Sequence, residues 1–195
     1  RLVRLHAGAA QRPGGRLSEV YSGKDLDAAY DFVESDSVNA GDLEAAAGRA
    51  AVSTQGARCV RIAGDGSSLT LARLGRGKGK GFGPIGVVRQ RALGLKVISA
   101  LAMDEVGVPL GVIAQTWWAR PEGRHRTRKQ GKDDAKRAKP RDKETARWLE
   151  TIERSAARLD EVGAQGWFQL DREADAWAIL SALESTGHRF TVRSA

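Results

Sequence analysis

The sequence has little cysteine and no long apolar segment. It contains one cysteine and one methionine among 195 residues. A single cysteine excludes an internal disulfide framework and a cysteine-rich zinc site. No apolar run approaches the ~18 residues that a membrane-spanning helix requires, and no secretory leader opens the chain. We therefore expect a cytoplasmic protein that has no membrane partner.

The positive charge of the chain is concentrated in one segment. The formal net charge is +8, and segment 120–147 holds twelve Lys and Arg but five Asp and Glu. Because residues 120–142 are rich in charge, Pro and Gly, they predict a flexible basic loop. Such a loop suits the phosphate backbone of double-stranded DNA, although a loop that is merely solvated is the alternative. The candidate DNA contacts are Arg120, Arg124, Arg126, Arg128, Lys129 and Lys132.

Hydrophobic periodicity changes near residue 52. Residues 1–52 are rich in Ala and predict a small helical region, with a helix that turns Leu26, Ala29, Tyr30 and Val33 inward and a second over 39–52. The remaining segments predict strands at 57–65, 69–74, 94–103 and 108–118, then a helix, a strand, a helix and a strand at 143–162, 165–170, 173–185 and 189–192. This order indicates a mixed α/β sheet with an antiparallel first half.

Several large side chains are expected in the core of this sheet. Trp148 and Trp177 occupy apolar faces at helical spacing. Trp117 and Trp118 are neighbours in a strand, so one of them should face the core. Cys59, in the first strand, should behave as a small buried apolar residue.

Two aspartates stand where predicted strands end. Asp65 and Asp171 each follow an apolar run. If the two strands are parallel neighbours, both carboxylates emerge at the same sheet edge, where hard oxygen ligands can hold Mg²⁺. Turn formation is the alternative role for an aspartate at a strand end.

Short sequence motifs surround these aspartates and follow one another in a fixed order along the chain. Asp65 opens Asp-Gly-Ser-Ser-Leu, and Asp171 opens Asp-Arg-Glu-Ala-Asp; between them lie Val-Pro-Leu-Gly at 108–111, Trp-Trp-Ala-Arg-Pro at 117–121 and Lys-Glu-Thr-Ala-Arg-Trp at 143–148. The set resembles the DDE transposases of bacterial insertion sequences, in the branch marked by the DREAD motif. The resemblance covers effectively the whole chain.

The resemblance implies a fold and a reaction. It implies a ribonuclease H-like β-β-β-α-β-α-β catalytic domain over 57–195, after a partial helical DNA-binding domain over 1–52. It also implies cut-and-paste DNA transposition, in which transposon ends are hydrolysed with Mg²⁺ (Mn²⁺ can substitute) and a freed 3′ hydroxyl is then transferred. Asp65 and Asp171 correspond to the first two catalytic, metal-binding aspartates. Arg172 is a further candidate DNA contact, and the implied protein is a homodimer that associates with the nucleoid.

One element of the family pattern is missing. The third catalytic acid of the family is a Glu beyond the DREAD segment, and residues 172–195 contain no matching Tyr, Arg, Glu and Lys pattern. We therefore expect a truncated transposase that binds DNA weakly and cuts it slowly or not at all. Two alternatives stay open: a non-catalytic DNA-binding or regulatory protein, and a sequence-indifferent metal-dependent nuclease that is complete as it stands.

Overall fold

The computed structural model describes residues 7–9, 11–12, 15–53, 59–71, 81–85, 92–121 and 144–194. The chain divides into two compact units, 1–43 and 44–195. No helix among the described residues is both long and apolar enough to cross a bilayer.

The first unit is helical. It contains α2 (Leu17–Val20) and α3 (Gly23–Glu34), followed by the first turn of α4. Ala29 of α3 is buried, as its spacing predicts, whereas Tyr30 and Val33 on the same predicted face are 44% and 64% exposed. The apolar face of α3 is therefore only partly covered within this unit.

Helix α4 (Ala40–Val52) is shared between the two units, with most of its length in the second. Ala51 and Val52 are buried, and Val52 belongs to the core of the sheet. Gly48 lies against the Ile113 carbonyl so closely that a side chain there would overlap it. The sequence grouped this whole helix with a domain over 1–52, whereas the division between the two compact units falls within it, after Leu43.

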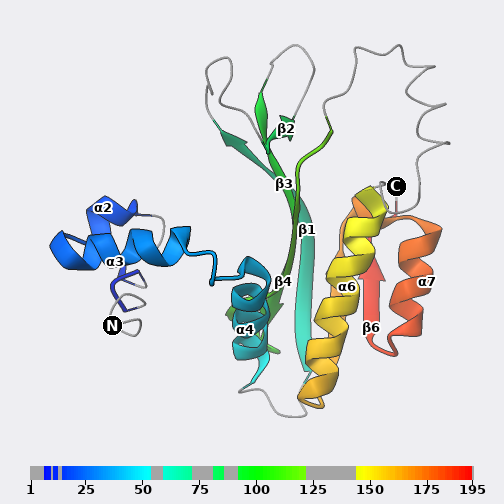
Figure 1. Cartoon of the computed structure of the whole chain (residues 1–195). Helices are drawn as coiled ribbons and strands as arrows, with labels where there is room; N and C mark the ends of the chain where they lie inside the picture. The colour runs from blue at the N-terminus through cyan, green and yellow to red at the C-terminus, as the bar shows by residue number, and fades with distance from the viewer. Residues whose placement is uncertain are drawn as a thin grey trace. The chain divides into compact units, whose positions relative to one another are not determined.

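The second unit is built on one mixed sheet (Figure 1). Its strands are β1 (Cys59–Leu71), β2 (Gly83–Pro84), β3 (Leu93–Met103), β4 (Pro109–Trp118), β5 (Gln165–Leu170) and β6 (Arg189–Val192). Strand β3 pairs antiparallel with β1, β2 and β4, and β5 lies parallel to both β1 and β6. The predicted mixed α/β class with an antiparallel first half is confirmed.

Strand β1 is longer than the sequence predicts. We expected separate strands at 57–65 and 69–74, with Asp65 at the end of the first. Instead β1 and β3 pair without interruption, from the pair of Arg61 with Met103 to the pair of Leu71 with Leu93. Asp65 is therefore interior to a strand, although the pairing of β1 with β5 extends only to Gly64.

Helices α6 (Glu144–Glu161) and α7 (Trp177–Ser185) pack on one face of the sheet (Figure 1). Buried residues of α6 recur at spacings of three and four, which is the pattern of a helix with one apolar face. They include Trp148, Ile152, Ala156 and Leu159, so the expectation that Trp148 lies in the core is confirmed. The core also contains Phe168 and Leu170 of β5.

Trp177 does not lie in the core, contrary to the prediction. The expected helix over 173–185 is interrupted, because Arg172–Ala174 form a 3₁₀ turn and α7 begins only at Trp177. Ile179 and Leu183, four residues apart, are the residues of α7 that become buried, and Trp177 is 83% exposed.

Two smaller expectations have mixed outcomes. Trp118 packs against the core while Trp117 is 47% exposed, so one member of the pair faces inward as predicted. Cys59 is half-buried at the beginning of β1 rather than fully enclosed.

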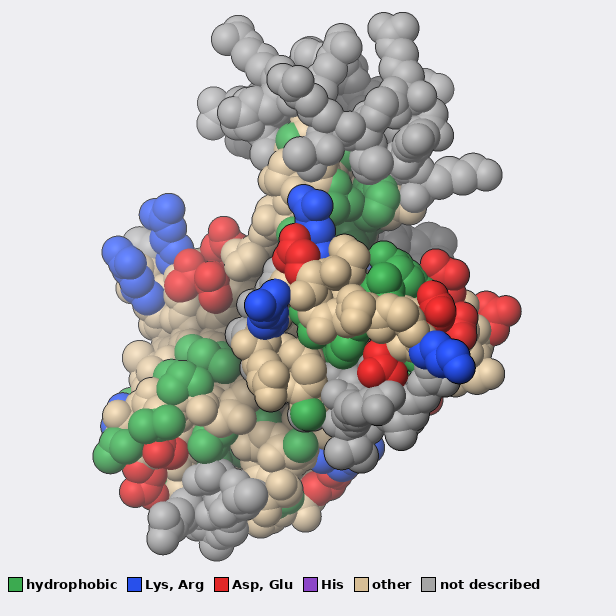
Figure 2. All heavy atoms as spheres, turned by 90° about the vertical axis from the view of Figure 1, so that its left-hand side faces the viewer, with side chains coloured by type: hydrophobic (Ala, Val, Ile, Leu, Met, Phe, Trp, Pro, Cys, Tyr) green, Lys and Arg blue, Asp and Glu red, His purple; other side chains and the backbone are tan. Residues whose placement is uncertain are grey.

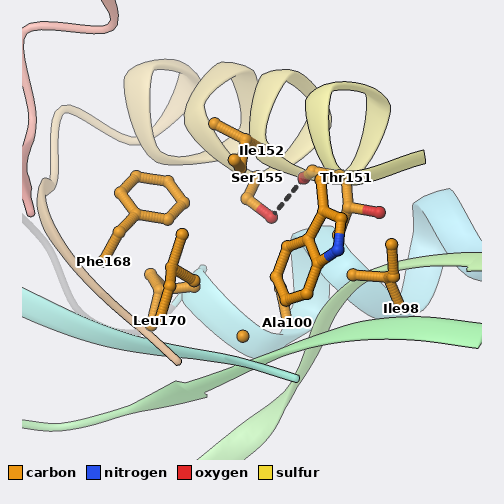
Figure 3. A pocket seen from close by; sticks show the side chains of 10 residues that line it. Ile98, Ala100, Thr151, Ile152, Ser155, Phe168 and Leu170 are labelled. Atoms are coloured by element: carbon orange, nitrogen blue, oxygen red, sulfur yellow. Dashed lines mark hydrogen bonds between the residues drawn. The ribbon is translucent and has the colours of Figure 1, made fainter. Parts of the chain in front are cut away.

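The packing between α6 and the sheet is nearly complete. Figure 3 shows a small space there, bounded by labelled side chains of β3, α6 and β5. Its volume is about 10 Å³, about enough for a single water molecule. Ser155 donates a hydrogen bond to the Thr151 carbonyl oxygen at 2.8 Å and so satisfies its hydroxyl within α6. The space therefore belongs to the core and is no ligand site.

A buried charge cluster joins α4, α6 and β4. Arg158 of α6 is only 6% exposed and donates to the Ile113 carbonyl and to both carboxylate oxygens of Glu44, at 2.9 and 2.8 Å. Glu44 also accepts from the Gln115 backbone N–H at 2.9 Å. Burial alone would raise the pKa of Glu44, but the hydrogen bond from Arg158, the Gln115 N–H and the positive charges of Arg154 and Arg158 outweigh burial and lower it.

Replacing Glu44 should destabilise the second unit. Glu44→Ala leaves Arg158 buried without its counter-charge, so we expect a loss of about 3 kcal/mol in the free energy of unfolding at pH 7. Because the folded-state pKa of Glu44 lies below its ordinary value of 4.5, the wild-type contribution is complete above about pH 4.5 and is lost as pH falls through the folded-state pKa. Urea denaturation between pH 3 and 7 measures both effects.

Glu153→Ala is the matched control, because Glu153 is an exposed residue of α6. It should change stability by less than about 0.5 kcal/mol. Equal stability of the Glu44→Ala and Glu153→Ala variants would contradict this account of the cluster.

Candidate active site

The parallel pairing of β1 and β5 brings the two predicted aspartates to neighbouring positions. The last pair in the register is Gly64 with Leu170. Asp65 is the next residue of β1 and Asp171 directly follows β5, so the two residues stand side by side where the parallel ladder ends. The sequence separates them by more than a hundred positions, and the expected juxtaposition is present in the fold.

Strand alternation places Asp65 on the face of the sheet opposite the helices. Its neighbours Gly64 and Gly66 face α6. A Cβ added at Gly64 would lie 3.5 Å from the Trp148 ring, and one added at Gly66 would lie 3.8 Å from it. Successive residues of a strand point to opposite faces, so Asp65 points away from Trp148. The glycines let the indole lie against the backbone of β1, directly behind Asp65.

On the face away from α6, the two aspartates line an open hollow of about 480 Å³. The hollow is lined by Ala63, Gly64, Asp65, Trp167, Gln169, Leu170, Asp171, Thr191 and Arg193. Asp65 is exposed and Asp171 is half-buried, so both carboxylates are accessible to solutes.

Local backbone groups orient both carboxylates. Asp65 accepts a hydrogen bond from the Gly66 N–H, and Asp171 accepts one from the Glu173 N–H, each at 2.9 Å. In both residues the acceptor is Oδ1, and Oδ2 has no hydrogen bond to another described residue. Two oriented carboxylates with uncommitted oxygens suit a hard divalent cation such as Mg²⁺, so the residues present fit that ion as part of its ligand set.

The described residues supply no third His, Cys, Asp or Glu ligand beside the two aspartates. Within the parts of the chain that the structure describes, no three His, Cys, Asp or Glu residues gather closely enough to hold a metal ion. Glu173 is the acid nearest to Asp171 in the sequence. Its Oε2 lies 3.0 Å from the point that a Cβ at Gly66 would occupy, on the Trp148 side of β1. Glu173 is thus separated by β1 from the face that carries Asp65.

The basic residues predicted to contact DNA fall into two groups. Arg124, Arg126, Arg128, Lys129 and Lys132 lie outside the described residues. Arg172 follows Asp171 directly and is exposed in the 3₁₀ turn. On the face shown in Figure 2, coloured basic side chains lie near acidic ones in several places.

Arg120 is already engaged in an ion pair. Its Nε lies 2.5 Å from Glu144 Oε1, and Lys96 Nζ lies 3.4 Å from Glu144 Oε2. Burial alone would raise the pKa of Glu144, but the Arg120 and Lys96 contacts lower it. Because Arg120 follows β4 and Glu144 begins α6, their ion pair joins these two elements.

Sequence reasoning missed further polar residues in line with the aspartates. Ser99 of β3 pairs with Asp65, and Gln115 of β4 pairs with Ser99 and donates to its hydroxyl at 3.0 Å. Arg193 lines the hollow on the other side of Asp171. None of the three belongs to a motif with chemical meaning, so only the strand register could reveal them.

Neither a protein-family model nor a curated protein matches the chain.

When no divalent cation is present in solution, removing one of the two neighbouring aspartate charges should stabilise the protein. We expect Asp65→Asn to raise the melting temperature by about 2 °C at low salt, because like charges on adjacent strands repel. Added Mg²⁺ should raise the melting temperature of the wild type more than that of the variant, since binding stabilises the folded state. Differential scanning fluorimetry with and without Mg²⁺ measures both shifts, and Glu153→Gln controls for net charge. An equal Mg²⁺ response in the wild type and Asp65→Asn would contradict a cation site at Asp65.

Proposed function

We propose that this chain is part of a DNA transposase in which Asp65 and Asp171 hold the catalytic metal. The observation that carries the proposal is the register of β1 and β5, which sets these two residues side by side. The Asp-Arg-Glu-Ala-Asp word and the other family motifs supply the reaction class. The order of three long antiparallel strands, helix, strand, helix and strand supports a ribonuclease H-like domain.

The roles of the protein groups follow from their positions. Asp65 and Asp171 would hold Mg²⁺ through their carboxylate oxygens, and the bound ion would stabilise negative charge on the phosphodiester undergoing hydrolysis or strand transfer. The backbone N–H groups of Gly66 and Glu173 keep the carboxylates oriented. Trp148 supports β1 from behind, so the acids stand on a packed core.

DNA binding would depend chiefly on electrostatic attraction. The basic residues of segment 120–142 and the exposed Arg172 would contact phosphates, which position a duplex without reading its sequence. We expect Arg120 to contribute less than its neighbours, because its guanidinium is paired with Glu144.

A second candidate function is DNA binding without catalysis. It is favoured by the absence of a third carboxylate beside Asp65 and Asp171 among the described residues. Each divalent ion needs several fixed oxygens, so two carboxylates alone would hold the metal weakly and leave a slow enzyme or an inactive one.

Substitution of either aspartate should abolish metal-dependent chemistry. We expect the wild-type chain to bind Mn²⁺ weakly and to nick supercoiled plasmid slowly. Asp65→Asn and Asp171→Asn should each weaken Mn²⁺ binding by about ten-fold or more, because each removes one of two charged ligands. Electron paramagnetic resonance of free Mn²⁺ measures binding, and agarose gels measure nicking.

Three outcomes separate the candidates. Loss of both Mn²⁺ binding and nicking in the two variants, with joining of a 3′-hydroxyl oligonucleotide to the plasmid by the wild type, supports a transposase. Nicking without joining, on any sequence, indicates a nuclease. Salt-sensitive DNA binding that survives Asp65→Asn, with no nicking by any form, favours the non-catalytic protein and contradicts the main proposal.

A further inference from the structure

Arg193 occupies a position set by the same register that joins the two aspartates. Strand β6 pairs with β5 through Leu170 and Val192, and the Arg193 N–H continues the ladder by donating to the Leu170 carbonyl at 3.0 Å. Asp65, Asp171 and Arg193 are therefore successive members of one row across β1, β5 and β6. All three residues line the same hollow.

The row of Asp65, Asp171 and Arg193 lies on the face of the sheet that points away from the helices. Phe190 and Val192 pair with Phe168 and Leu170, which are buried on the α6 side. Thr191 lies on the other face, because its hydroxyl accepts from the Trp167 indole N–H at 3.1 Å. Alternation along the strand then assigns Arg193 to the face of Thr191.

The guanidinium of Arg193 is available for a ligand. Arg193 is exposed, and no described carboxylate forms an ion pair with it, whereas Arg120, Arg154 and Arg158 each have one. A phosphodiester that approaches two carboxylates is repelled by them, and a positive charge beside the carboxylates reduces that repulsion. The planar guanidinium also matches the geometry of phosphate oxygens.

We propose that Arg193 binds the phosphodiester group that lies next to the metal held by Asp65 and Asp171. This inference rests on the proposed function and adds to it a substrate-contacting residue. Arg193 would orient the phosphate through hydrogen bonds, and Asp65 and Asp171 would hold the ion.

Arg189 provides a matched control within the same strand. It is exposed, pairs with Trp167 and points to the same face as Arg193. Four residues of strand separate the two positions, which corresponds to about 13 Å. Replacing either arginine by Ala removes one positive charge from one face of one strand, so only the location differs.

The experiment measures the phosphate and the metal separately. The full chain is loaded with Mn²⁺ and titrated with thymidylyl-3′,5′-thymidine, and the relaxation of the ³¹P signal reports phosphate held near the ion. We expect Arg193→Ala to reduce the affinity for this dinucleotide about ten-fold or more, since a hydrogen bond to a charged group is lost. Arg189→Ala should change it less than about two-fold, and Arg193→Lys should be intermediate.

Mn²⁺ binding by the same proteins separates this inference from the proposed function. Unchanged Mn²⁺ binding and melting temperature in Arg193→Ala, with loss of the ³¹P effect, supports a phosphate contact. Equal dinucleotide affinity in the two alanine variants overturns the role of Arg193, even if Asp65→Asn and Asp171→Asn behave as proposed. A wild type that fails to bind Mn²⁺ overturns the metal site itself, and the role of Arg193 falls with it.

Discussion

The parallel ladder between β1 and β5 is the constraint on which the candidate site depends. Its last pair, Gly64 with Leu170, fixes which residues stand at the point where the ladder ends. A shift of one residue in either strand would move its aspartate to the opposite face, because the side-chain period of a strand is two. The register is held by the buried residues that precede the aspartates, including Ile62 and Phe168.

The two faces of the sheet have different tasks. The face toward α6 and α7 is apolar and closely packed, and it holds Trp148 against the two glycines that flank Asp65. The opposite face carries the aspartates, Gln169, Thr191 and Arg193 beside Trp167. Rigid packing on one face thus supports polar residues on the other, which is the arrangement that a catalytic or binding site requires.

Ion pairs stabilise the edges of this unit. Glu44 joins α4 to Arg158 of α6, and Glu144 joins the beginning of α6 to Arg120 after β4. The pKa of each glutamate is lowered by these contacts. Part of the basic charge of the chain is therefore committed to structure. Arg193 and Arg172, which form no ion pair with a described carboxylate, are the better candidates for contacts with a polyanion.

Periodicity in the sequence predicts the mixed α/β class and the helix at α6 with Trp148 inward. The two aspartates were predicted as a pair from their places after apolar runs together with the motifs that surround them. The local pattern could not show that residues 59–71 form one strand, because the polar segment after Asp65 has the composition of a turn. In the fold, the backbone hydrogen-bonding groups of this segment are satisfied by pairing with β3. It could not place Trp177 either, since the break at Asp175 and Ala176 rotates α7 relative to the predicted helix.

The sequence by itself determined the residue types of the candidate site: two acids, each after an apolar run, within motifs of recognisable order. Only the tertiary structure decided that Arg193 and Ser99 stand beside them and that Glu173 lies on the other side of β1. The physical reason is that strand order and register are set by long-range burial and hydrogen bonding between segments far apart in the chain. These are interactions that no local pattern of residues contains.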